Sequence, residues 1–234
     1  MKQLLTFFSF LLVTSLAWSQ TADEIIDNHI KAIGGAQKWN EINTMYSEMT
    51  SDMGGMKIPI KIWQQHMKGM RVEFEVQGMT GIQVVTDKDG WSLMPFMGQT
   101  KPEPTNEEAL KSARSQLDIR GQLLDYKGKG STVEYLGEDE DEGVEVYKIR
   151  LTDSNKTETT YFIEKESYLM IKAVSKVNFQ GQEIDAVTKM SNYKDVGGIK
   201  IPHSVDSMST GKMEIVKTEI NPAIAEDKFA MPKQ

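Results

Sequence analysis

The residues best suited to chemistry in this chain are few and lie far apart. None of the three histidines, His29, His66 and His203, has a partner at a metal-ligand spacing. There is no cysteine, and no Gly-x-Ser-x-Gly, His-Glu-x-x-His or phosphate-loop motif. His29 lies beside an apolar helical stripe, which favours a packed side chain over a ligand. The sequence therefore predicts no catalytic residue, no metal site and no cofactor, with an enzyme built on an unfamiliar site as the remaining alternative.

Two further patterns have both a chemical and a plainer interpretation. The acidic run from Glu138 to Glu142 could attract calcium, but it lacks the spaced oxygen ligands and internal glycine of a calcium loop. We therefore interpret it as a solvated hairpin tip. Met53 with Met56, and His66 with Met70, offer soft ligands for Cu(I). Their strand-like alternation favours an adaptable apolar surface instead.

The first nineteen residues have the pattern of a secretory signal peptide. Lys2 is a basic start, Leu4 to Leu16 is a short apolar run, and Ala17-Trp18-Ser19 is a small-x-small cleavage site. Because no cysteine follows the site, we expect a secreted, periplasmic protein without a lipid anchor. The mature chain, residues 20–234, is predicted to be one domain. Its formal charge changes from −7 to −8 when Lys2 is lost, which argues against nucleic acid as a partner.

Most of the mature chain alternates with the two-residue period of a partly buried strand. From residue 158 to residue 220, such runs are separated by short, glycine-bearing turns, and no helix-length pattern interrupts them. The run at residues 70–76 alternates in the same way, with Val72 and Phe74 on one face and Arg71 on the other. This layout predicts a mainly β (α+β) fold in which an antiparallel sheet curls on itself.

Two helical segments are expected to cover the concave face of this sheet. The first begins with a capping box at Thr21 and Glu24 and presents Ile26, Ile30 and Ile33 on one face. The second, after residue 105, carries an apolar stripe of its own. Two short helices are too few to cover a wide sheet, so an apolar cleft is predicted. Its wall is predicted to contain Ile60, Ile62, Val72, Phe74, Trp91, Leu93, Phe96 and Leu117. Arg71 is the candidate for a polar rim, although its opposite parity allows it to point away from the cleft.

Several short segments resemble the LolA/LolB-like family of periplasmic, outer-membrane lipoprotein-sorting carriers, in the form found in Bacteroidetes. The likeness covers nearly the whole mature chain. The segments that carry it are Ile33-Gly34-Gly35, Trp63 ahead of Met70-Arg71-Val72-Glu73-Phe74, Asp89-Gly90-Trp91-Ser92-Leu93-Met94-Pro95-Phe96, Tyr193 to His203, and Asn221 through Phe229 to Pro232.

The resemblance implies an incomplete antiparallel barrel of about eleven strands, covered by short helices, with a cavity for acyl chains. It also implies a monomeric, non-enzymatic carrier of acylated lipoprotein or lipid that meets envelope membrane proteins. Proteobacterial members have an Arg-Pro segment where this chain reads Lys68-Gly69-Met70-Arg71, so lipoprotein and other lipid-like cargo both stay open. The alternative function is an envelope sensor or interaction domain of the same fold.

Overall fold

The computed structural model describes residues 21–179, 182–208 and 210–232, so the predicted signal peptide lies outside the described residues. The helices are α1 (Ala22–Ala32), α2 (Ala36–Asn40) and α3 (Glu107–Ala113), with 3-10 turns η1 (Pro95–Met97), η2 (Arg114–Leu117) and η3 (Glu226–Phe229). The strands are β1 (Thr44–Met53), β2 (Met56–Gln65), β3 (Gly69–Val76), β4 (Met79–Thr86), β5 (Gly90–Leu93), β6 (Glu103–Pro104), β7 (Thr132–Asp141), β8 (Val144–Thr152), β9 (Glu158–Glu164), β10 (Met170–Phe179), β11 (Gln182–Val196), β12 (Ile199–Ser207) and β13 (Gly211–Ile220).

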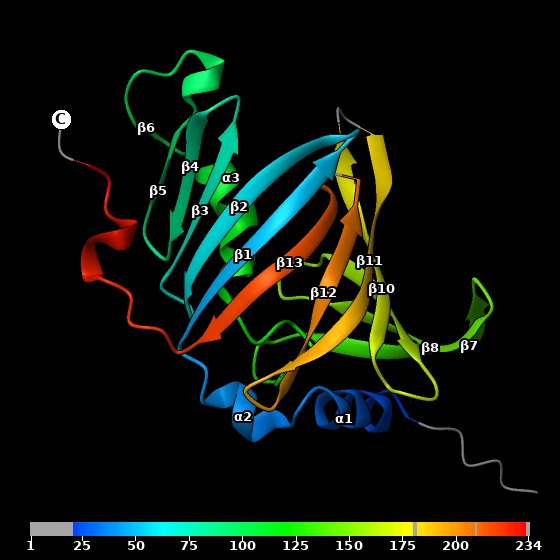
Figure 1. The fold of residues 1–234 in the computed structure, drawn as a ribbon. Coiled ribbons are helices and arrows are strands. Elements are labelled where there is room, and N and C mark those ends of the chain that lie inside the picture. Colours follow the sequence, from blue (N-terminus) through cyan, green and yellow to red (C-terminus); the bar gives the residue numbers. More distant parts are fainter. Residues whose placement is uncertain (1–20, 180–181, 209, 233–234) are drawn as a thin grey trace, which may run out of the picture.

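All of these strands belong to one antiparallel sheet, in the order β6-β5-β4-β3-β2-β1-β13-β12-β11-β10-β9-β8-β7. The sheet curls into a half-barrel whose edge strands, β6 and β7, do not meet (Figure 1). The predicted curled antiparallel sheet with short helices is confirmed. The sheet has thirteen strands where about eleven were expected, and one of the additional strands, β6, is only two residues long.

Helix α1 closes one end of this half-barrel. Thr21 and Glu24 form the predicted capping box, in which each side chain accepts a hydrogen bond from the other residue's backbone N–H. Ile26 and Ile30 are buried, as expected for the apolar face. The helix does not run along the concave face, however. It lies with α2 across the ends of the strands, at the bottom of Figure 1.

A close backbone approach fixes the position of this lid. A Cβ on Gly34 would lie 2.5 Å from the carbonyl oxygen of Gly198 and 2.9 Å from the Cα of Ile199, so only glycine fits there. Next to this contact, the Lys200 N–H donates to the Ile33 carbonyl at 2.9 Å. The glycines after the first helix and before β12 are therefore partners in one contact between α1 and the β11–β12 turn.

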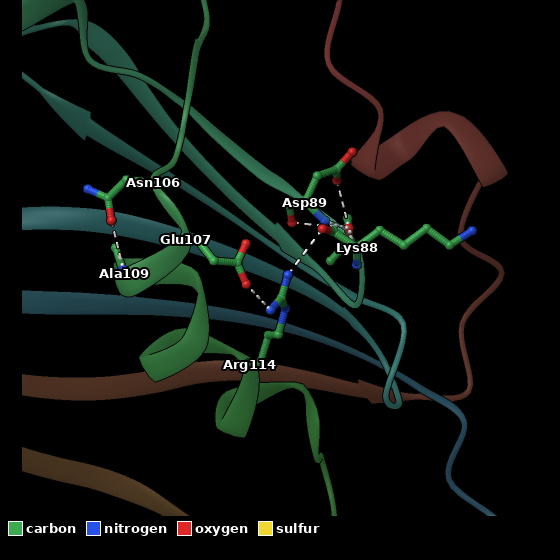
Figure 2. A network of polar contacts seen from close by, with 7 residues as sticks. Lys88, Asp89, Asn106, Glu107, Ala109 and Arg114 are labelled. Atoms are coloured by element: carbon green, nitrogen blue, oxygen red, sulfur yellow. Dashed lines mark hydrogen bonds and ion pairs between the residues drawn. The ribbon is translucent and has the colours of Figure 1, made fainter.

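Helix α3 packs on the inner face of β2 to β4. Asn106 caps it by accepting a hydrogen bond from the Ala109 N–H at 2.9 Å. Beyond the helix, Arg114 donates to the Glu107 carboxylate at 2.7 Å and to the Lys88 carbonyl at 3.1 Å (Figure 2). These contacts fasten α3 and η2 to the β4–β5 turn.

Two clusters of buried apolar residues form the core. The larger joins α1 and α2 to the segment before β7 and to the inner face of β7 to β12. The smaller lies under α3 and consists of Met70, Val85, Leu110 and Leu117, with Ile62, Val72 and Ala113 packed against them. The stripe predicted for the second helical segment is therefore the part of α3 and η2 that contacts the sheet.

The acidic run is the tip of the β7–β8 hairpin, as predicted, and it also makes ion pairs. Four of its five carboxylates form ion pairs with lysines of other segments: Glu138 with Lys165, Asp139 with Lys148, Asp141 with Lys172 and Glu142 with Lys189. A register shift next to Gly137, whose φ is 102°, accompanies the bend that brings the tip to these lysines. The predicted solvated hairpin tip is confirmed, since Glu138, Asp139, Glu140 and Glu142 are exposed, and the ion pairs with lysines are an addition that the sequence did not predict.

Within the residues that the structure describes, none of the helices combines the length and the apolar character needed to span a membrane.

Candidate functional site

The inner face of the half-barrel carries an apolar row that crosses five neighbouring strands. In register, Ile215 of β13 pairs with Met49 of β1, Met49 with Ile60 of β2, and Ile60 with Phe74 of β3. Paired residues of antiparallel strands share a face, so these four side chains lie side by side. Met49, Ile60 and Phe74 are partly buried and belong to neither buried cluster. We call Ile215, Met49, Ile60 and Phe74 the inner apolar row.

The fifth position of this row is Gly81 of β4, and its lack of a side chain makes room for two aromatic rings. A Cβ on Gly81 would lie 2.7 Å from the Phe74 ring and 2.8 Å from the Phe96 ring. The two rings meet edge to face, with centroids 5.7 Å apart. Phe96 reaches this position from η1, so the predicted wall residues Ile60, Phe74 and Phe96 are brought together.

Three other predicted wall residues form part of the packed core: Ile62 and Val72 on the same face of the sheet, and Leu117 on η2, which covers that face. Ile62 and Val72 are a cross-strand pair one step closer to α1 and α2. Leu117 is 2 % exposed, and all three belong to the smaller cluster under α3. The face of Ile62 and Val72 was predicted correctly. Because α3 and η2 cover Ile62 and Val72, with Leu117 of η2 packed on them, these residues do not line open space.

Trp91 and Leu93 were placed on the wrong face. Trp91 pairs with Val84, and Val84 pairs with Arg71, whose parity is opposite to that of Val72. Gly90 takes the inner position because a Cβ there would lie 2.5 Å from the Leu110 side chain. The next residue, Trp91, must then point outward. Its indole N–H donates to the Phe229 carbonyl at 3.1 Å, and it is 1 % exposed beneath the C-terminal segment.

Arg71 is not a polar rim of the inner face either. It lies on the outer face, where it donates to Glu73 at 2.7 Å and to the Lys228 carbonyl at 3.3 Å. Burial alone would raise the pKa of Glu73, but the Arg71 hydrogen bond and the charge of Lys228 together lower it. The side chain thus holds the C-terminal segment against the sheet.

An apolar cavity of about 370 Å³ lies behind α1 and α2, within the size range of small-ligand pockets. It is lined by His29, Ile30, Ile33, Trp39, Ile119, Arg120, Gly121, Gln122, Leu123, Leu124, Tyr161, Met170, Met190, Tyr193, Lys200 and Pro202. None of these residues was predicted as a wall residue. They come from segments far apart in the sequence, so no local pattern could have shown that they meet.

Burial favours the neutral forms of the histidine and the two tyrosines that line this cavity. Burial lowers the pKa of His29, whose ring Nδ1 donates to the Tyr168 carbonyl at 2.8 Å. This contact confirms the prediction of a packed histidine. Burial raises the pKa of Tyr161 to about 12 and also raises that of Tyr193, so both hydroxyls keep their protons. Neutral tyrosine and histidine groups cost less to desolvate than charged ones when a hydrocarbon chain covers them.

A second apolar row connects this cavity to the inner face of β1 and β2. Met190, which lines the cavity, pairs with Val205, and Val205 pairs with Met213. Met213 pairs with Ser51, which is opposite Ile58 of β2. This second row runs beside the inner apolar row. Together the rows give a continuous, largely apolar path from β11 to β3.

The described part of the chain bears on the metal-binding alternatives that the sequence left open. No set of three or more His, Cys, Asp or Glu side chains among the described residues is arranged to hold a metal ion. Met53 and Met56 face each other across the β1–β2 turn and are about half exposed. The arrangement is suited to binding apolar groups through shape and desolvation.

These features define a half-barrel with an apolar inner face, the LolA-like fold. No family model matches the sequence, and neither does any curated protein sequence. Solved structures do match. A DUF1329 family protein from Desulfovibrio piger is 13 % identical with a TM-score of 0.57, and the match covers 90 % of this chain and 98 % of that one.

Two further structures show the same fold. A LolA superfamily protein from Nitrosomonas europaea is 11 % identical with a TM-score of 0.57, over 90 % of this chain and 98 % of the other. A domain named for outer-membrane lipoprotein sorting, from Vibrio parahaemolyticus, is 12 % identical with a TM-score of 0.54, over 88 % and 95 % of the two chains. At such identities the likeness concerns the fold alone.

Proposed function

We propose that this protein is a non-enzymatic carrier that binds lipid-like amphiphiles with their acyl chains against the inner apolar row. The observation that carries the proposal is that Met49, Ile60 and Phe74 are paired in register and only partly buried, although the face around them is apolar. Side chains of this kind are normally covered in a monomer. An acyl chain would cover them.

The free energy available from such a surface is sufficient for reversible binding. Burying about ten methylene groups at about 0.8 kcal/mol each gives about 8 kcal/mol before association costs. Micromolar affinity requires about 8 kcal/mol net. One or two acyl chains therefore suffice, and the carrier needs no covalent step.

The rim of the half-barrel also suits transfer of an apolar cargo. Exposed methionines lie at the β1–β2, β3–β4 and β12–β13 turns, namely Met53, Met56, Met79 and Met208. These turns all lie at the end opposite α1 and α2 (Figure 1). Flexible thioether side chains adapt to partners of different shape. The acyl chain therefore enters at this rim, whether the cargo is an acylated lipoprotein or a free lipid.

The resemblance of the sequence to periplasmic carriers, and the signal-peptide pattern at residues 1–19, support action in the periplasm as a monomer. The solved lipoprotein-sorting domain with the same fold supports an acylated cargo. An envelope membrane protein that gives or receives the cargo belongs to the same proposal.

A fluorescent fatty-acyl probe tests the proposal on delipidated protein. We expect the parent to bind at micromolar concentration and Phe74→Asp to lose at least tenfold in affinity, because a carboxylate would stand in the apolar row. Leu93→Asp is the matched control, since Leu93 is a partly buried residue of the outer face. Thermal unfolding would show that both variants are folded.

Two results would contradict the carrier proposal. A folded, delipidated parent that binds no probe would favour the alternative, an interaction domain acting by protein contact. Loss of binding in Leu93→Asp but not in Phe74→Asp would place the ligand on the wrong face of the sheet.

A further inference from the structure

A second, polar pocket of about 520 Å³ lies on the other side of the segment from residue 120 to residue 124. Arg120, Gln122 and Leu124 line both this pocket and the apolar cavity. The segment is therefore a shared wall, with an apolar surface on one side and a charged surface on the other. We call the second pocket the cationic pocket, after Lys111, Arg114, Arg120 and Lys129, which line it.

Of the three carboxylates that line the cationic pocket, Asp118 and Asp153 are already engaged. Asp118 lies 2.5 Å from the Lys129 Nζ and accepts a hydrogen bond from the Arg120 backbone N–H. Asp153 accepts from two backbone N–H groups of its own loop, at 2.8 Å each. The Asp125 carboxylate lies against Gly128 of its own turn. Among the described residues, none of these three carboxylates forms an ion pair with Arg120 or Lys111.

Arg120 is a partly buried cation that no carboxylate of the described residues compensates. Its terminal nitrogen donates to the Asn40 carbonyl at 2.8 Å, and its buried Nε has no hydrogen-bond partner. Among the described residues, no carboxylate lies within ion-pair distance of Arg120 or of the exposed Lys111. A buried guanidinium nitrogen without an acceptor is costly, so an acceptor from a ligand would be stabilising.

His66 also has a buried polar atom that a hydrogen bond from a ligand would stabilise. Its ring Nδ1 is buried without a hydrogen-bond partner and lies 3.5 Å from Asp118, beyond good hydrogen-bond geometry. Burial, and then the charge of Arg120, lower the pKa of His66. Arg114 completes the wall. Two of its nitrogens are used by Glu107 and Lys88, as Figure 2 shows, and its Nε is a third unpartnered atom.

We propose that the cationic pocket binds an anionic phosphate or carboxylate group, with Arg120 as its main contact. A planar guanidinium suits the paired oxygens of such groups. The inference rests on the proposed function in one respect: it identifies the anion as the head group of the amphiphile whose chain occupies the apolar side. Free phosphate has the same chemistry, and the experiment separates the two sources.

The test compares lysophosphatidic acid with a monoacylglycerol of the same chain length, each titrated into the delipidated full-length mature protein, and inorganic phosphate alone. We expect the phosphate-bearing lipid to bind at least tenfold more tightly, and this advantage to shrink as salt is raised. Arg120→Gln should abolish the advantage by lowering the affinity for the phosphate-bearing lipid to about that for the monoacylglycerol. Arg120→Lys keeps the positive charge but loses the paired N–H donors of the guanidinium, so it should retain part of the advantage.

Two variants guard against a trivial loss of folding. Lys111→Gln alters an exposed side chain and should lower the preference severalfold without changing thermal unfolding. Arg150→Gln is the matched control, because Arg150 pairs with Glu134 and Glu158 and lines no part of the pocket. It should leave the preference unchanged.

The outcomes distinguish this inference from the carrier proposal. Equal affinity for the two lipids would overturn the anion site and leave the carrier intact. Arg120-dependent binding of inorganic phosphate, with no binding of either lipid, would support the anion site and overturn the carrier. Absence of binding by all three ligands would overturn both.

Discussion

Helix α3 and η2 cover one part of the inner face and leave the inner apolar row open. This division predicts that Leu117→Ala lowers stability without lowering acyl-chain affinity. Leu117 is 2 % exposed and packs with Met70, Val85 and Leu110 beneath α3. Removing three buried carbons costs about 2.4 kcal/mol at about 0.8 kcal/mol per methylene. The cavity left behind raises the expected loss of unfolding free energy to about 3 to 4 kcal/mol. For a chain of this size the melting temperature should fall by about 10 °C.

Ile60→Ala is the comparison, because it removes the same number of carbons from a partly buried position in the inner apolar row. Its cost should be lower, about 1 to 2 kcal/mol, since part of the side chain already faces solvent and no closed cavity is left. Urea unfolding followed by tryptophan fluorescence measures both free energies. Acyl-probe titration of the same samples should show the reverse order: near-parent affinity for Leu117→Ala and a severalfold loss for Ile60→Ala.

A loss of less than 1 kcal/mol for Leu117→Ala would refute this reasoning, because it would mean that α3 does not fill the space over Met70 and Val85. A large loss of probe affinity in the same variant would also contradict it, since Leu117 would then be a wall residue and not core.

Three further predictions follow from local contacts. Gly81→Ala should push the Phe74 and Phe96 rings apart and destabilise the fold by about 1 to 3 kcal/mol, as measured by urea unfolding; unchanged stability would show that the rings move freely. Asp141→Asn should cost about 1 kcal/mol because it breaks the pair with Lys172, whereas Glu140→Gln, whose carboxylate makes no ion pair within the described residues, should be silent; equal effects would contradict the pairing. Stability should fall between pH 7 and pH 5, because burial lowers the folded-state pKa of His29 below its ordinary 6.5 and the unfolded chain then binds more protons. This contribution is complete above 6.5 and is lost as the pH falls toward the folded pKa. In His29→Gln the unfolding free energy should depend less on pH in this range. An unchanged slope of unfolding free energy against pH would refute this role of His29.

Where the strands are regular, the sequence alone was sufficient to predict which face of the sheet each side chain lies on. Ile60, Ile62, Val72 and Phe74 alternate without a bulge through β2 and β3, so their common face could be assigned from parity alone. The alternation could not show which of them a helix would cover. That depends on where α3 docks, and Ile62 and Val72 became core for this reason.

The failure at Trp91 has the same origin. Alternation in β5 is regular, but the inner position is Gly90, which has no apolar side chain to reveal its face. Glycine is required there because Leu110 of α3 packs against it, a contact between segments twenty residues apart. A large aromatic residue was therefore assigned to the wrong face.

The two pockets could not be predicted from local patterns. His66, Arg114, Arg120 and Lys129 come from the β2–β3 turn, η2 and the segment before β7, and only the curl of the sheet brings them together. The acidic hairpin shows the same limit: its turn was evident, but its lysine partners depend on a bend after Tyr135.

The central claim, that acyl chains lie on the inner face, is tested most directly by photo-crosslinking. A fatty acid with a diazirine at its terminal carbon would be bound to the delipidated protein, irradiated, and the modified residues mapped by peptide mass spectrometry. The account predicts labels on Met49, Ile60, Phe74 or Ile215, and their loss when unlabelled fatty acid competes. Labels confined to the outer face, at Trp63 or Leu93, or labelling that fatty acid does not compete, would contradict it.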